Sequence, residues 1–142
     1  MRKQNRVILA VVGFIILSLG LEGWGANWKY TVENVFGDVI FIDMASRTRP
    51  SDNIVRVWVK LVYSQKGVLQ AVEETGKQEC RDVNYTLNLM EYDCREKRSR
   101  ILSEHCFSKD EFILDSRIYS NPQWESAIQD SICTSLLKAV CE

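Results

Sequence analysis

The segment from Ile54 to Tyr63 alternates between two kinds of side chain, and this pattern constrains the fold more than any other feature of the sequence. One set of alternate positions is apolar or aromatic: Val55, Val57, Val59, Leu61 and Tyr63. The set between them begins with Arg56, Trp58 and Lys60. A period of two is that of a β-strand, whose successive side chains point to opposite faces. The segment therefore predicts a strand in a sheet with one buried face and one partly wet face.

Further segments of the chain share this strand pattern. They are 28–32, 39–42, 83–89, 99–107 and 112–119. Between them, 44–53 contains Ser, Thr, Asp and Pro50, which is loop composition. The stretch 65–77 is less strand-like and predicts a short helix ending near Gly76, or an irregular excursion.

The C-terminal residues change to a helical period. Ile132, Leu136 and Val140 recur every fourth residue, and the residue after each is also apolar. They form one broad apolar stripe on a helix that begins at an N-cap, Asp130 or Ser131. Strands joined by short turns and followed by one helix predict an α+β fold. We expect a meandering antiparallel sheet of about six strands with the C-terminal helix packed on one face.

The N-terminus has the layout of a secretory signal peptide. Arg2, Lys3 and Arg6 precede an apolar run, and small residues follow near Gly25. We predict a signal peptide over residues 1–25 and one domain over residues 26–142. The apolar run is about 15 residues, shorter than a comfortable membrane span, so an uncleaved N-terminal anchor is the alternative. The protein is then exported, to the periplasm or to the cell surface and exterior, and touches a membrane only through that segment.

Five cysteines in an exported chain predict disulfides, with at least one thiol left over. Spacing alone does not decide the pairing. Cys94 with Cys141 is our preferred pair, because it would tie the end of a strand to the last turn of the helix. Cys106 with Cys133 is a second candidate, between the following strand and the start of the helix. Cys80 would then be the unpaired thiol.

The composition argues against several classes of function. The chain has one histidine and a net charge of −1, so we expect neither a metal site nor a nucleic-acid partner. No cysteine pair has the C-x2-C spacing of a zinc site, and His105 beside Cys106 on a strand would point to the opposite face. No nucleophile elbow, H-E-x-x-H helix or phosphate loop occurs. The prediction is a protein without a cofactor and not an enzyme.

Two groups of residues are candidates for contact with a partner. Arg98 and Arg100 belong to a basic cluster that either forms a solvated turn or docks an acidic partner. Arg56, Trp58 and Lys60 lie on the wetter face of the clearest strand. For Trp58 two interpretations compete, contact with a partner and burial beneath the terminal helix, and we expect burial.

Several short segments carry a family resemblance: 28–30, 38–43, 57–60, Cys94, the strand pair around 108–110, and 130–131 leading to 139–141. They resemble the domain family named after surface-adhesin protein E, small exported bacterial proteins. The resemblance implies an antiparallel sheet with a C-terminal helix, and it favours Cys94–Cys141 as the family's disulfide. The family's name comes from a lipoprotein that adheres to host matrix and serum proteins and can dimerise. The present chain lacks a lipobox cysteine, and Gln129 stands where a proline is expected.

Two hypotheses of function follow. The first is an exported, non-catalytic domain that binds a protein or small ligand, adhesin-like by resemblance, and that can form a homodimer. The second is a periplasmic thiol-redox or ligand-processing factor that uses an unpaired cysteine such as Cys80.

Overall fold

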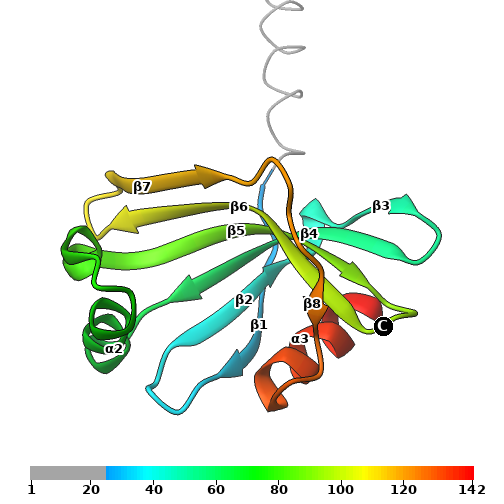
Figure 1. Ribbon diagram of the computed structural model, residues 1–142, viewed down its shortest axis with the longest axis horizontal. Coiled ribbons are helices and arrows are strands. Elements are labelled where there is room, and N and C mark those ends of the chain that lie inside the picture. Colours follow the sequence, from blue (N-terminus) through cyan, green and yellow to red (C-terminus); the bar gives the residue numbers. More distant parts are fainter. Residues whose placement is uncertain (1–24) are drawn as a thin grey trace, which may run out of the picture.

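The alternating segments pair into one antiparallel sheet in the computed structural model, which describes residues 25–142 except the side chain of Glu79 (Figure 1). The strands are β1 (Trp28–Glu33), β2 (Val39–Asp43), β3 (Thr48–Ser51), β4 (Ile54–Val62), β5 (Val83–Asp93), β6 (Arg98–Ser108), β7 (Ile113–Ile118) and β8 (Glu125–Ser126). The helices are α2 (Gln65–Thr75) and α3 (Ser131–Cys141), with short 3-10 helices η1 (Met44–Ser46) and η2 (Gln78–Asp82). The expected signal segment lies, apart from Gly25, outside the described residues.

The main path of the sheet is a meander in the order β1-β2-β4-β5-β6-β7, with every neighbouring pair antiparallel. These six strands and the terminal helix confirm the predicted α+β fold. The two further strands are short: β3 pairs with the start of β4, and β8 with the start of β6. Residues 44–53 were predicted to be a loop but contain η1 and β3. A strand can form there despite Pro50, because β3 is an edge strand that pairs on one side only.

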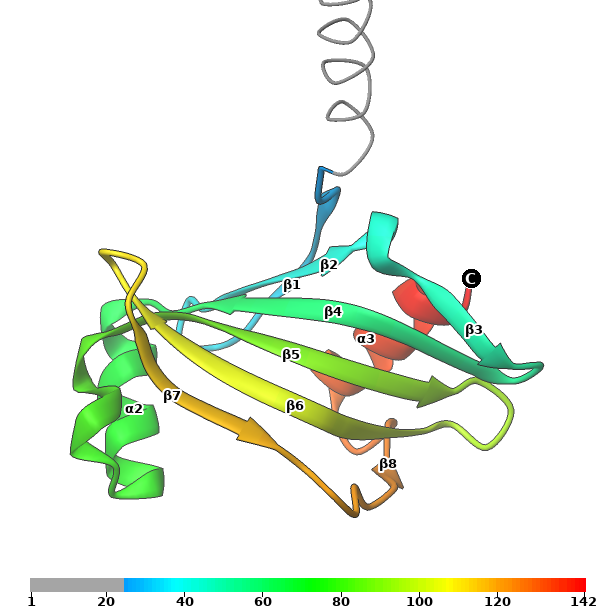
Figure 2. The same cartoon turned by 90° about the horizontal axis from the view of Figure 1, so that it is seen from above.

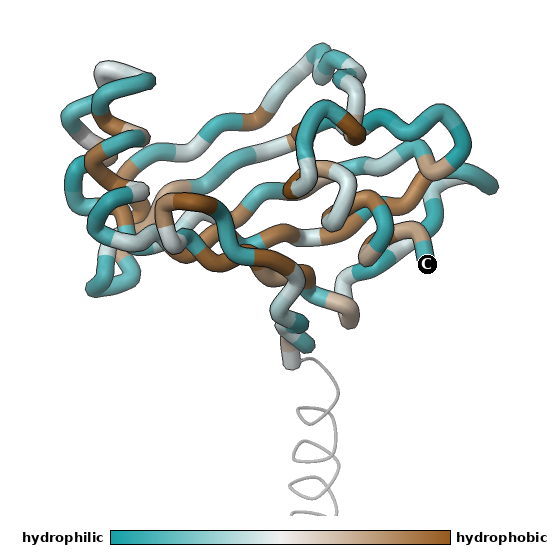
Figure 3. Tube along the Cα trace, turned by 90° about the horizontal axis from the view of Figure 1, so that it is seen from below, coloured by the Kyte–Doolittle hydropathy of each residue, from teal (hydrophilic) through white to brown (hydrophobic). Residues whose placement is uncertain are grey.

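The core lies between α3 and one face of the sheet. Val55 and Val57 of β4 are fully buried, as is Val140 of α3. Leu136 and Leu137 belong to the same cluster, so the predicted apolar stripe is the face that packs. In Figure 2 the sheet lies between the viewer and α3, and Figure 3 shows the hydrophobic stretches of α3 and the strands from the opposite side.

Both helices begin at a side chain that caps them, and α2 ends at a glycine. The Asp130 carboxylate accepts a hydrogen bond of 2.8 Å from the backbone N–H of Cys133, so Asp130 is the N-cap of α3. The Ser64 hydroxyl accepts from the backbone N–H of Gly67 at the start of α2. Gly76 ends α2 in a left-handed conformation, with φ of +66°, that glycine adopts without strain.

A disulfide joins Cys94, just beyond β5, to Cys141 in the last turn of α3, with an S–S distance of 2.04 Å. The second pairing, Cys106 with Cys133, is absent: both residues are free cysteines and line different cavities. The physical reason is the sheet's geometry. Cys106 lies at the far end of β6 from the short β8 pairing and the start of α3, beyond the reach of a side-chain bond.

Replacing Cys94 and Cys141 together by serine should lower the free energy of unfolding by about 4 kcal/mol, because the bridge closes a long loop in the unfolded chain. The separation is 47 residues. Urea unfolding, followed by tryptophan fluorescence, measures the change. Cys133→Ser is the matched control, since Cys133 is an unbonded cysteine on the same helix. Equal stability of the double variant and the control would contradict this role of the bridge.

Candidate functional site

The face of the sheet opposite α3, which we call the open face, is the candidate functional site. Its aromatic and charged side chains include Trp28, Tyr30, Phe41, Arg56, Trp58, Lys60, Tyr85, Glu91, Asp93, Arg98, Arg100, His105 and Phe107. No helix of residues 25–142 packs on this face. The α3 helix covers the opposite face, and the α2–η2 segment lines a cavity with residues of that opposite face, including Cys106.

All five predicted contact residues lie on the open face: Arg56, Trp58, Lys60, Arg98 and Arg100. The expectation that the terminal helix buries Trp58 is wrong. Trp58 lies between Val57 and Val59 on β4, and α3 covers both valines. Because successive side chains of a strand point to opposite faces, the Trp58 indole lies on the open face. Trp58 is half-buried by its neighbours, and its ring centroid lies 6.0 Å from that of His105 on β6.

Aromatic rings surround the ammonium group of Lys60. The Lys60 Nζ lies 4.2 Å from the centroid of the Tyr85 ring and 5.8 Å from that of Trp28. The negative faces of aromatic rings attract a cation at such distances. The interaction joins three strands, since Trp28 is on β1, Lys60 on β4 and Tyr85 on β5. Lys60 thus holds a positive charge in the middle of an aromatic surface.

Tyr85 is packed from the other side as well. Its ring stacks on that of Phe107, with a centroid separation of 4.9 Å and an interplanar angle of 14°. Its hydroxyl donates a hydrogen bond of 2.5 Å to Glu111. Burial, together with the bond to Glu111 and the charge of that carboxylate, raises the pKa of Tyr85 to about 12. The phenol therefore stays neutral at physiological pH and acts as a fixed platform for Lys60.

A cluster of ion pairs occupies the other end of the open face. Arg56 and Arg100 both bind Glu91, through Nη2–Oε distances of 2.6 and 2.7 Å. Arg98 binds Asp93 through an Nε–Oδ2 distance of 3.0 Å. Three guanidinium groups thus share two carboxylates, and the carboxylates are the buried partners: the side chain of Glu91 is 3% exposed against 42% for Arg56. The exposed surface of the cluster is therefore cationic.

Opposing influences act on the pKa of Glu91. Burial alone would raise it, but the hydrogen bonds and charges of Arg56 and Arg100 outweigh burial and hold it below its ordinary value of 4.5. Asp93 behaves in the same way, with its pKa lowered by the backbone N–H of Glu96 and by Arg98. Both carboxylates are thus ionised at neutral pH and hold the arginines in place.

Trp124 completes the cluster from the segment between β7 and β8. Its ring centroid lies 4.9 Å from the Arg98 Cζ and 4.3 Å from the Arg100 Cζ. The sequence does not predict Trp124 as a site residue, because the loop has no periodic pattern that would place its side chain. Trp28, Tyr85 and Phe107 were also missed as site residues. Their alternation along predicted strands could have placed them on the face of Trp58 once the strand register was known.

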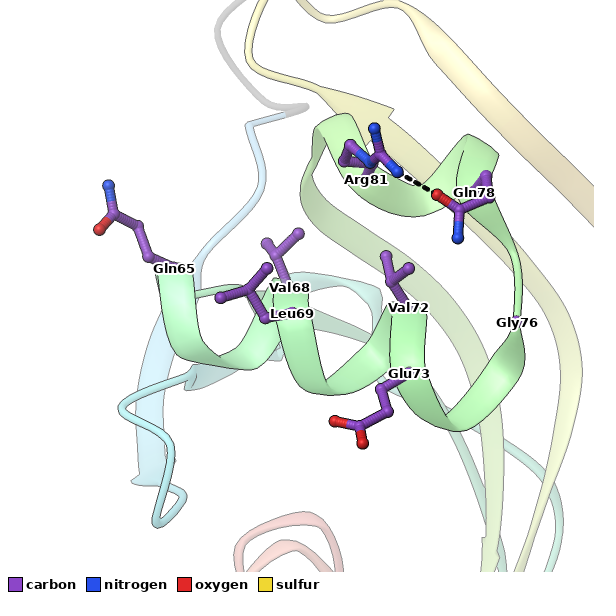
Figure 4. Close-up of a pocket in the computed structure, with 8 residues that line it drawn as sticks. All are labelled: Gln65, Val68, Leu69, Val72, Glu73, Gly76, Gln78 and Arg81. Atoms are coloured by element: carbon purple, nitrogen blue, oxygen red, sulfur yellow. Dashed lines mark hydrogen bonds between the residues drawn. The ribbon is translucent and has the colours of Figure 1, made fainter.

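The second candidate site is a hollow between α2 and η2, with a volume of about 830 Å³ (Figure 4). Val68, Leu69 and Val72 provide its apolar part, with Gln78 and Arg81 facing them from η2. It is an open depression on one helical segment, without the convergent charged groups of the open face. We therefore take the open face as the stronger candidate.

Metal sites and membrane-spanning helices were two further possibilities for the described residues. No group of three or more His, Cys, Asp and Glu side chains within 25–142 lies close enough to hold a metal ion. Among the helices of that part of the chain, none has the length and hydropathy needed to cross a membrane. The arrangement that the structure does contain is a broad, exposed surface suited to recognition.

The fold and the open face define a class of protein: a small α+β domain with one sheet, one helical face and one face left for contact. The family model described as Surface-adhesin protein E matches residues 28–142, so the chain belongs to the surface-adhesin protein E family. The family resemblance seen in the sequence is thereby confirmed. The family's description is that of a surface adhesin, which implies exposure at the surface.

Solved structures share the fold at low sequence identity. Crystal form II of Haemophilus influenzae protein E matches with a TM-score of 0.54 and 11% identity, covering 83% of this chain and 89% of that one. A selenomethionine form of the same protein matches with a TM-score of 0.51 and 11% identity, covering 83% and 88%. No curated protein sequence matches the chain. At this identity the likeness concerns the fold alone.

Replacing Glu91 by glutamine should lower the free energy of unfolding at pH 7 by about 2 kcal/mol, because two guanidinium groups lose a charged partner. The folded-state pKa of Glu91 is lowered, so its contribution is present above pH 4.5 and is lost as the pH falls through the folded-state value. The variant should therefore lose less stability than the wild type between pH 6 and roughly pH 3. Urea unfolding across this range measures both effects. Equal pH dependence in the two proteins would contradict the assignment.

Proposed function

We propose that the chain is an exported, non-catalytic binding domain that contacts a protein partner through the open face. The observation that carries the proposal is an uncovered sheet face on which aromatic rings and cationic groups lie side by side. Protein interfaces are enriched in aromatic residues and arginine, and the residues that contribute most to binding are often Trp, Tyr and Arg. Membership of an adhesin family supports a binding role, and the open face supplies a location for it.

The chemistry of the open face indicates the kind of partner. The Arg56–Arg98–Arg100 cluster has one more cation than carboxylate, and Lys60 is surrounded by rings rather than by acids. Tyr30, which is 56% exposed, offers aromatic area beside Phe41, with ring centroids 6.3 Å apart. We infer a partner protein whose surface combines acidic side chains with apolar ones, since these would pair with guanidinium groups and pack on rings.

The alternative was a thiol-redox factor that uses an unpaired cysteine such as Cys80, and the other two free cysteines, Cys106 and Cys133, give it no support. A reactive cysteine needs a lowered pKa, because the thiolate is the nucleophile. Burial, together with the charge of Glu104, raises the pKa of Cys106 to about 12. Burial and then the Asp130 carboxylate raise the pKa of Cys133. Both thiols are therefore protonated at neutral pH and poor nucleophiles.

The test is binding of the purified chain to immobilised extracellular-matrix extract and to immobilised serum proteins, measured by biolayer interferometry. We expect Trp58→Ala and Tyr30→Ala each to weaken binding about tenfold or more, as replacement of aromatic hot spots does. Leu69→Ala is the matched control, because Leu69 is an exposed apolar residue on α2, away from the open face. Thermal unfolding of each variant verifies that the fold is intact.

Three outcomes would overturn the proposal. The first is wild-type protein that binds neither the matrix extract nor the serum proteins. The second is binding that the open-face variants leave unchanged while Leu69→Ala reduces it. The third is a homodimer that forms at the concentrations of the assay and dissociates in the Trp58→Ala variant, since the open face would then be occupied by a second copy. Sedimentation velocity at the assay concentration separates this last case.

A further inference from the structure

Cys80 and Cys106 meet on the face of the sheet that α3 and η2 cover. Cys106 lies on β6 and is buried, and Cys80 lies in η2. Both residues line one small cavity of about 120 Å³, which also includes Tyr63 and Thr86. Burial is the main cause that raises the pKa of the Cys106 thiol, and the neighbouring Cys80 thiol is among the further causes. Cys80, the predicted unpaired thiol, therefore has Cys106 as a neighbour, although the two residues are 26 positions apart in the chain.

Neighbouring contacts hold η2 in this position without help from the cysteines. Lys77, just before η2, forms an ion pair with Asp115 through an Nζ–Oδ2 distance of 3.4 Å. Asp115 lies directly opposite Cys106 in the pairing of β6 with β7. At its other end η2 runs directly into Val83, which pairs with Ser108 on β6. Both ends of η2 are thus fixed to the strands around Cys106, which keeps Cys80 beside the cavity that the two cysteines share.

We propose that Cys80 and Cys106 form a second disulfide in the exported protein. The electron acceptor is a disulfide-bearing oxidant of an oxidising compartment, either oxidised glutathione or a protein disulfide. Two S–H bonds break and one S–S bond forms. The two electrons and two protons pass to the oxidant, whose S–S bond breaks to give two thiols.

The environments of the two cysteines set the order of the steps. Cys80 is the more accessible residue, so its thiolate attacks the oxidant's disulfide and releases one oxidant thiolate. The Cys106 sulfur then attacks the Cys80 sulfur of the mixed disulfide and releases the second thiolate. The raised pKa of Cys106 makes this second step slow at neutral pH, and it quickens as the pH rises.

The bond would fasten a segment that is otherwise lightly attached. Val68 and Val72 of α2 line the open hollow rather than the core. The attachments of the α2–η2 segment include the Lys77–Asp115 ion pair and the close approach of Gly67 to Asp38, where a Cβ on Gly67 would overlap the carboxylate. A covalent bond from η2 to β6 would hold the segment on the sheet when that ion pair is screened by salt.

The inference depends on the export part of the proposed function but not on the open face. The experiment therefore begins with purified full-length chain, reduced and then oxidised with a glutathione buffer at pH 8. Trypsin places each of the five cysteines in a different peptide, because a Lys or Arg lies between every consecutive pair. After blocking of free thiols, mass spectrometry should find peptide 78–81 linked to peptide 101–109. It should also find Cys133 as the one blocked thiol.

Single variants supply the matched control. Cys80→Ser should remove the cross-link and lower the midpoint of thermal unfolding of the oxidised protein by roughly 10 °C, since the loop it closes is lost. Under reducing conditions the same variant and the wild type should unfold together. Cys133→Ser should leave the cross-link and the midpoint unchanged, because Cys133 is apart from this pair.

Three blocked thiols after saturating oxidation, or a link from Cys80 to a cysteine other than Cys106, would overturn the inference. A cross-link that forms without any rise in the unfolding midpoint would overturn the fastening role. Protein recovered from cells with the Cys80–Cys106 link absent, although the purified chain forms it, would contradict export to an oxidising compartment. That last result counts against the proposed function, and the first two leave it intact.

Discussion

The packing of α3 on one face of β4 is the constraint on which the rest of the molecule depends. Val55 and Val57 of the strand and Val140 of the helix are completely buried in one cluster between the two elements. The Cys94–Cys141 bridge holds the last turn of that helix at the end of β5. Once this face is covered, the period of two places every intervening side chain of β4 on the other side.

The open face follows from that arrangement, because a single helix covers a single face. An uncovered sheet face with many rings would expose a large apolar area, which favours association. Here Lys60 lies among the rings, and the arginines around Glu91 stand at the other end. These charged groups keep the surface hydrated and give it a positive charge. The same residues therefore limit indiscriminate association and define the partner that we propose.

Predictions from the sequence succeeded where the pattern was local. The strand predicted over 54–63, observed as Ile54–Val62, and the apolar stripe of α3 come from side-chain periodicity. The meander comes from the short turns between consecutive strands, and the structure confirms it. The five predicted contact residues share one face because alternation and antiparallel register place them there. The prediction was wrong for Trp58, since periodicity states which residues share a face but not which of the two faces the helix covers. The pairing of Cys106 with Cys133 was wrong for a related reason, because spacing along the chain does not give distance across the sheet.

Some features of the site have no local signal at all. Trp124 reaches Arg98 and Arg100 from a loop whose path depends on β7 and β8. The meeting of Cys80 with Cys106 requires η2 to lie against the end of β6, which the Lys77–Asp115 ion pair and the turn into β5 bring about. By itself the sequence determined the strands, the terminal helix and the division of side chains between two faces, because these depend on backbone periodicity. Only the tertiary structure decided which face is covered and which cysteines meet, because both depend on the docking of segments that are distant in the chain.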